Sequence, residues 1–114
     1  MKKVKESEAK IEFFYTPDCN VWRKALPVLK EALKEMGLKE PSVKVIKTQE
    51  EADKFKFTGS PTIKVKGIDL IPEARNASRF TPMGCRIIWW KGKAFEFPSK
   101  EMIIEEARKL LEMK

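Results

Sequence analysis

The segment Ile11-Glu12-Phe13-Phe14-Tyr15-Thr16-Pro17-Asp18-Cys19 decides how the rest of the chain is interpreted. Its first five residues are mostly aromatic or apolar and stop at a polar turn, which is typical of a buried strand. Beyond Cys19, apolar side chains recur at steps of three and four residues, at Trp22, Leu26, Leu29, Leu33 and Met36. This spacing predicts a helix that ends at Gly37, so Cys19 lies at a strand-to-helix junction.

Strand and helix patterns then continue in alternation. Val43–Ile46 is a second apolar strand, and the intervening helix makes it parallel to the first. Thr48 is predicted to begin a short helix, because Glu51 lies three residues later and completes a capping box. Thr62–Lys66 alternates between apolar and polar residues and predicts a third strand.

Residues 67–84 contain two prolines, two glycines and few apolar side chains, so we predict an irregular stretch. Ordered loops of this length are uncommon and often functional. Arg86–Trp90 follows as a fourth strand, which Lys91-Gly92 turns into a hairpin with residues 94–97. Ser99 then caps a final helix.

The chain has 114 residues, which predicts a single domain over 1–114 with a flexible N-terminus over 1–9. It contains no histidine, which excludes Ser-His-Asp and Cys-His catalysis and the zinc sites that use histidine. Two cysteines exclude a disulfide-dense scaffold. We expect no metal centre and no cofactor.

The 24 Lys and Arg residues exceed the 17 Asp and Glu residues, but basic and acidic side chains are interspersed along the chain. This pattern favours a solvated surface and predicts no nucleic-acid binding. Amides are few and Lys and Glu abundant, as in heat-adapted proteins. The longest apolar run, Ile87–Trp90, is too short to cross a bilayer, and no signal peptide is recognisable. We therefore expect no membrane partner and a cytoplasmic location with reduced thiols.

The predicted order β-α-β-α-β-β-α resembles that of a minimal thioredoxin-like domain. Cys19 occupies the junction after the first strand, and Pro27 lies eight residues later, where thioredoxins carry a proline in the active-site helix. Gly59-Ser60-Pro61-Thr62 opens the third strand, where that superfamily has its cis-proline. The resemblance implies an α/β fold of three layers, with a mixed sheet of four to five strands and helices on both faces.

Residues 11–113 also resemble a family of small thioredoxin-fold proteins that are sometimes labelled alkylmercury-lyase-like. The matching residues and motifs are Cys19, Trp22, Ala25-Leu26, Gly59-Ser60-Pro61-Thr62-Ile63, Gly67-Ile68-Asp69 and Cys85-Arg86. The chain departs from the family pattern at Asn20-Val21, where Pro-Asn is usual. The resemblance implies thiol-based chemistry, but the chain lacks the acid and cysteine constellation that carbon–mercury cleavage needs.

Trp22 stands three residues after Cys19, where a thioredoxin has its second cysteine. We therefore predict monothiol exchange or redox sensing through Cys19, with a protein or small-molecule thiol resolving the mixed disulfide. A nearby helix N-terminus would favour the Cys19 thiolate. Cys85 is a candidate second thiol. Because the third strand runs away from the site and the fourth begins at its far end, we predict no Cys19–Cys85 bond, and only a return path through residues 67–84 would allow one.

Trp22, Ser60 and Pro61 are the candidate substrate-binding residues. The family resemblance implies a cis Ser60–Pro61 bond, which would direct the backbone of Ser60 toward an extended ligand. Two alternatives to thiol exchange remain open. One is a non-enzymatic binding module that uses Trp22, Ser60 and the 67–84 loop, and the other is binding of mercury or copper through cysteine.

Overall fold

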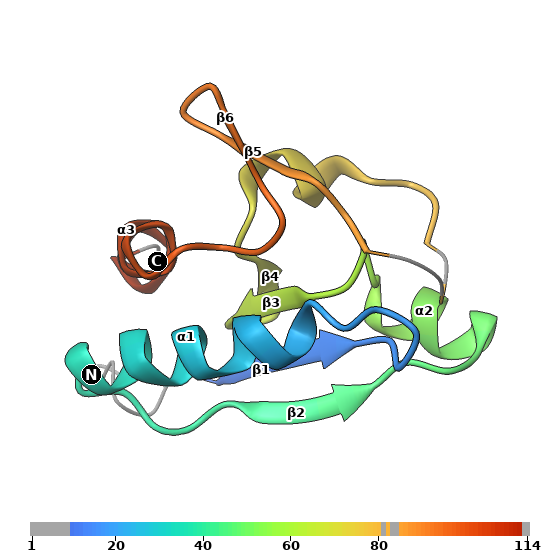
Figure 1. The fold of residues 1–114 in the computed structure, drawn as a ribbon, viewed down its shortest axis with the longest axis horizontal. Helices are drawn as coiled ribbons and strands as arrows, with labels where there is room; N and C mark the ends of the chain where they lie inside the picture. The colour runs from blue at the N-terminus through green and yellow to red at the C-terminus, as the bar shows by residue number, and fades with distance from the viewer. Residues whose placement is uncertain (1–9, 81, 83–84, 113–114) are drawn as a thin grey trace, which may run out of the picture.

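The computed structural model describes residues 10–80, 82 and 85–112 (Figure 1). The predicted flexibility of residues 1–9 lies outside the described residues. The elements, in chain order, are β1 (Ile11–Tyr15), α1 (Trp22–Glu35), β2 (Ser42–Val45), α2 (Gln49–Phe55), β3 (Thr62–Val65), β4 (Ile68–Asp69), a 3-10 helix (Pro72–Asn76), β5 (Ile88–Trp90), β6 (Lys93–Phe95) and α3 (Lys100–Glu112).

Four strands form a mixed sheet in the order β2-β1-β3-β4. β1 is parallel to β2, as predicted, because α1 carries the chain across between them. β3 is antiparallel to β1, and β4 is antiparallel to β3. The prediction that Arg86–Trp90 supplies the fourth strand of this sheet was wrong, since β4 takes that place. The predicted hairpin is confirmed, because β5 pairs with β6 in a separate sheet.

The two faces of the sheet are covered by different helices. Phe13 of β1 packs with buried residues of α1 and α3, including Leu29 and Leu110. Its neighbour Phe14 points to the opposite face and packs with Ala52 of α2. The expected α/β class with helices on both faces of a mixed sheet is therefore confirmed.

The helix boundaries follow local sequence signals. α1 retains Pro27 in its interior. At the start of α2, the Thr48 hydroxyl accepts the N–H of Glu51, and the Glu51 carboxylate accepts the N–H of Thr48, which confirms the capping box. α2 ends at Lys56, whose backbone is left-handed with φ of 51°. None of the helices in the described ranges is long and apolar enough to span a membrane.

Candidate functional site

A disulfide bond joins Cys19 and Cys85, whose Cα atoms are 5.4 Å apart. The prediction that these cysteines are not bonded was therefore wrong. β4 reverses the chain immediately after β3, so the fourth strand of the sheet ends before the 3-10 helix and Cys85 is not part of it. Cys85 forms a parallel bridge with Ser60. The prediction treated such a return of the chain to the site as the exception, and the position of Cys85 beside Ser60 shows that the return occurs.

The two bonded cysteines differ in exposure. Cys19 is 2% exposed and belongs to the interior. Its N–H donates to the Thr16 carbonyl at 3.3 Å, which closes the turn between β1 and α1. Cys85 is an exposed residue. A molecule approaching from solvent therefore meets Cys85 first.

Ser60 lies between the two chain segments that carry the cysteines. The Ser60–Pro61 bond is cis, as predicted. Ser60 is fully buried, and its hydroxyl accepts the N–H of Thr16 at 3.1 Å. Its carbonyl oxygen lies 3.9 Å from the sulfur of Cys19, so the reduced thiol could donate a weak hydrogen bond to it. Ligand contact through Ser60 and Pro61 stays a prediction.

Trp22 is the first residue of α1, and its ring stacks on Tyr15 with centroids 4.2 Å apart. The guanidinium of Arg23 lies 5.4 Å from the centre of the same indole ring. Trp22 thus packs against β1, and its contact with a substrate stays a prediction. Because α1 begins three residues after Cys19, the cysteine lies just outside the helix N-terminus.

A hydrogen-bond chain that sequence reasoning missed secures the residue next to Cys85. The guanidinium of Arg86 donates to the Thr58 hydroxyl at 2.8 Å, and that hydroxyl donates to the Asp69 carboxylate at 2.8 Å. Burial lowers the pKa of Arg86, while the charges of Asp69 and Glu73 oppose that shift. Asp69 and Arg86 both belong to motifs of the family resemblance, which is the signal that could have singled them out.

Position 59 requires glycine, because the backbone there lies against the side chain of Arg86. The φ of Gly59 is +139°, and a Cβ built there would lie 2.7 Å from the Cβ of Arg86. We expect Gly59→Ala to lower the free energy of unfolding by about 2–3 kcal/mol, because backbone strain and a steric clash add. Urea denaturation measures this loss.

Gly92→Ala provides the control for this prediction. Gly92 also has positive φ, at +78°, but nothing lies within 4 Å of the added Cβ. Only backbone strain applies there, so the expected loss is about 1 kcal/mol. Equal losses at Gly59 and Gly92 would contradict a close approach of Arg86.

The site therefore unites Cys19, Ser60, Pro61 and Cys85. A disulfide with one buried and one exposed cysteine can exchange with a thiol that approaches the exposed one. No group of three or more Cys, Asp or Glu residues suited to a metal ion occurs among the described residues. Mercury or copper binding would involve the reduced cysteines and stays a prediction. Comparisons of the chain with protein-family models, curated proteins and solved structures found no match.

Proposed function

We propose that this chain is a thioredoxin-like protein that exchanges thiols and disulfides, as a catalyst or a redox sensor, through the pair Cys19–Cys85. The strand order β2-β1-β3-β4, with only β1 and β2 parallel, supports the thioredoxin-like part of the proposal. The observation that carries the function is the Cys19–Cys85 disulfide beside the cis Ser60–Pro61 bond. A pair of cysteines replaces the single thiol of the sequence-based prediction.

The exchange begins at the exposed residue of the pair. The thiolate of an incoming thiol attacks the sulfur of Cys85, the bond between Cys85 and Cys19 breaks, and Cys19 leaves as a thiolate. A second external thiolate attacks the incoming sulfur of the mixed disulfide. The external thiols depart joined by a disulfide, and Cys85 departs as a thiolate. In total, the two external thiols have lost two protons and two electrons, and the protein disulfide has taken up both electrons.

Cys19 is the resolving thiol when the reduced protein attacks a substrate disulfide. It is buried, and it lies within bonding distance of Cys85 and 3.9 Å from the Ser60 carbonyl. In the reverse direction, the Cys85 thiolate attacks a substrate disulfide, and Cys19 displaces the substrate from the resulting mixed disulfide. The roles proposed here differ from the sequence-based prediction, in which Cys19 made the first attack.

A purely structural role for the Cys19–Cys85 disulfide is the alternative to thiol exchange. Disulfides in reducing compartments are mostly catalytic or sensing, although heat-adapted proteins also keep structural ones. Reduction potential separates the two, because structural disulfides have potentials below about −300 mV. We expect the reduction potential of the Cys19–Cys85 pair to lie above about −300 mV, because exposed disulfides have higher potentials than buried structural ones. Equilibration with glutathione or dithiothreitol buffers, followed by alkylation and mass spectrometry, measures the potential.

Catalysis is tested by insulin reduction coupled to dithiothreitol. Wild-type protein is expected to accelerate the reaction, whereas Cys85→Ser and Cys19→Ser each remove one step of the exchange. Equal rates for all three proteins, together with a potential well below about −300 mV, would leave the disulfide a structural element. A potential in the glutathione range without insulin reduction would favour redox sensing over catalysis.

A non-enzymatic binding module is the second candidate. Ile87 and Trp89 are exposed at 57% and 59%, at alternate positions after Cys85. Exposed apolar side chains of this kind favour contact with a partner. Binding through them would persist in the double variant that lacks both cysteines, whereas thiol exchange would not.

A further inference from the structure

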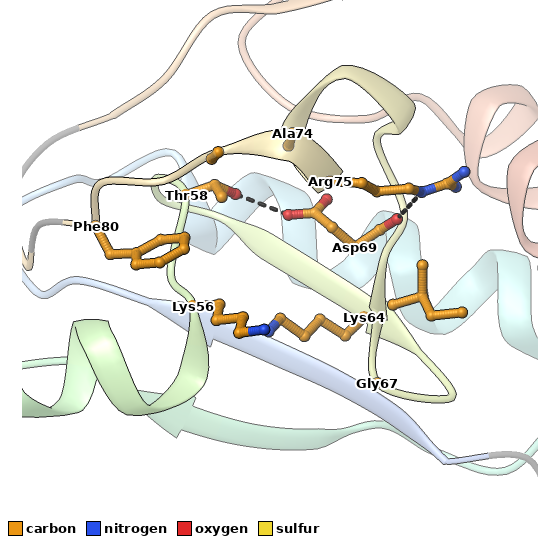
Figure 2. Close-up of a pocket in the computed structure, with 10 residues that line it drawn as sticks. Lys56, Thr58, Lys64, Gly67, Asp69, Ala74, Arg75 and Phe80 are labelled. Atoms are coloured by element: carbon orange, nitrogen blue, oxygen red, sulfur yellow. Dashed lines mark hydrogen bonds between the residues drawn. The ribbon is translucent and has the colours of Figure 1, made fainter.

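A cavity of about 330 Å³ lies away from the disulfide, on the α2 side of the sheet (Figure 2). Its walls come from the end of α2, the β3–β4 hairpin, the 3-10 helix and the segment after it. The polar and aromatic residues that line it are Lys56, Thr58, Lys64, Asp69, Arg75 and Phe80. Lys64 stands opposite Asp69 in the register of β3 and β4, so both side chains face this cavity.

Two lysines, Lys56 and Lys64, line the cavity. The left-handed backbone of Lys56 ends α2, and Figure 2 shows its side chain reaching toward that of Lys64. Lys64 is only 8% exposed, and its ammonium donates to the carbonyl of Phe55. Burial lowers the pKa of Lys64 and the charge of Lys56 lowers it further, while Asp69 and Glu12 raise it. In the described part of the chain, neither lysine lies within 4.0 Å of a carboxylate oxygen.

The acidic side chain in the cavity is engaged in other contacts. One oxygen of the Asp69 carboxylate accepts the Thr58 hydroxyl at 2.8 Å, and the other accepts the N–H of Ile71 at 2.9 Å. The guanidinium of Arg75 donates to the backbone carbonyls of Asp69 and Leu70. Three cationic side chains, Lys56, Lys64 and Arg75, line the cavity against the one carboxylate of Asp69, so the lining has a surplus of positive charge.

The aromatic wall of the cavity is anchored to α2. Phe80 packs with the apolar cluster around Phe14, and its carbonyl accepts the side-chain amide of Gln49 at 2.6 Å. Ala74 lines the cavity as a further apolar residue. The cavity thus combines a cationic end with a small apolar surface, as ligand sites for organic ions do.

We propose that this cavity binds a small organic anion, a carboxylate or a phosphate monoester. Its charged oxygens lie between the ammonium groups of Lys56 and Lys64, and its apolar part contacts Phe80. Such an anion offsets the repulsion between the two lysines and supplies charge-assisted hydrogen bonds in a partly desolvated place. Cys19 and Cys85 do not line the cavity, so this proposal stands independently of thiol exchange.

Calorimetric titration with phenyl phosphate, benzoate and phenol tests the proposal. Phenyl phosphate and benzoate separate the two anion types, and phenol keeps the ring without the charge. We expect at least one of the anions to bind and phenol to bind about tenfold more weakly or not at all. Lys56→Gln should weaken binding of that anion about tenfold, because a charge-assisted hydrogen bond is lost.

Lys39→Gln is the matched control, because it removes the same charge from an exposed residue outside the cavity. It should change the affinity less than twofold. Lys64→Met is a second variant, expected to lose binding while keeping the circular dichroism of the wild type. Lys56 is exposed, so Lys56→Gln decides the question even if Lys64→Met misfolds. Absence of anion binding to the wild type, or equal weakening by Lys39→Gln and Lys56→Gln, would overturn the proposal.

Discussion

Replacing Cys85 with serine is expected to lower the free energy of unfolding by about 4 kcal/mol. The disulfide links residues 66 positions apart, so it removes a large share of the conformational freedom of the unfolded chain. For a domain of this size, the melting temperature should fall by roughly 10–20 °C. Cys85 is exposed, so the new hydroxyl remains hydrated and adds little cost of its own. Urea denaturation without reductant measures the difference.

Dithiothreitol supplies the control for this experiment. Once the disulfide is reduced, wild-type protein and Cys85→Ser should have nearly the same stability, because neither contains the cross-link. A wild-type midpoint that does not respond to dithiothreitol, although mass spectrometry shows full reduction, would contradict the expected contribution of the disulfide.

Elements with strong local signals could be predicted from the sequence. Three signals each specify the local structure from a few neighbouring residues. They are the aromatic run of β1, the three-and-four spacing of apolar residues along α1 and the capping box at Thr48. The position of Cys19 after β1, and of Ser60 at the start of β3, follows from these elements together with the cis-proline motif. The two sides of the candidate site were therefore predictable.

The strand β4 was missed although its turn has a recognisable signal. Lys66-Gly67 and Lys91-Gly92 are the same dipeptide, and in both the two residues have positive φ, at 57° and 80° and at 50° and 78°. Positive φ at both central residues is the signature of a tight hairpin turn. Strand patterns with aromatic residues flank the second dipeptide on both sides, which makes its hairpin recognisable. After Lys66-Gly67 the strand has only two residues, too few for a pattern.

The pairing of Cys85 with Cys19 depended on this missed turn. With Ile68–Asp69 as the fourth strand, the chain is free to return to the start of β3. Next to Cys85, the described structure is held by tertiary contacts such as the Arg86–Thr58 hydrogen bond. No periodic pattern in the sequence encodes such contacts.

In the reduced protein, the Cys85 thiol is expected to react with iodoacetamide about a hundredfold faster than the Cys19 thiol. Cys85 is exposed and Cys19 is buried, so Cys19 reacts only when the structure around it opens locally. An opening that costs about 3 kcal/mol corresponds to this ratio. Cys19→Ser and Cys85→Ser each retain one thiol, so the rate measured by mass spectrometry belongs to one residue in each variant.

The same two variants in concentrated urea separate burial from intrinsic reactivity. There the two thiols should react at similar rates, because neither is protected. In the folded protein, Cys85 should also react faster than Cys19 with glutathione disulfide, so it forms the mixed disulfide first. A faster reaction at Cys19 in the folded protein would reverse the proposed roles, making Cys19 the attacking thiol and Cys85 the resolving one.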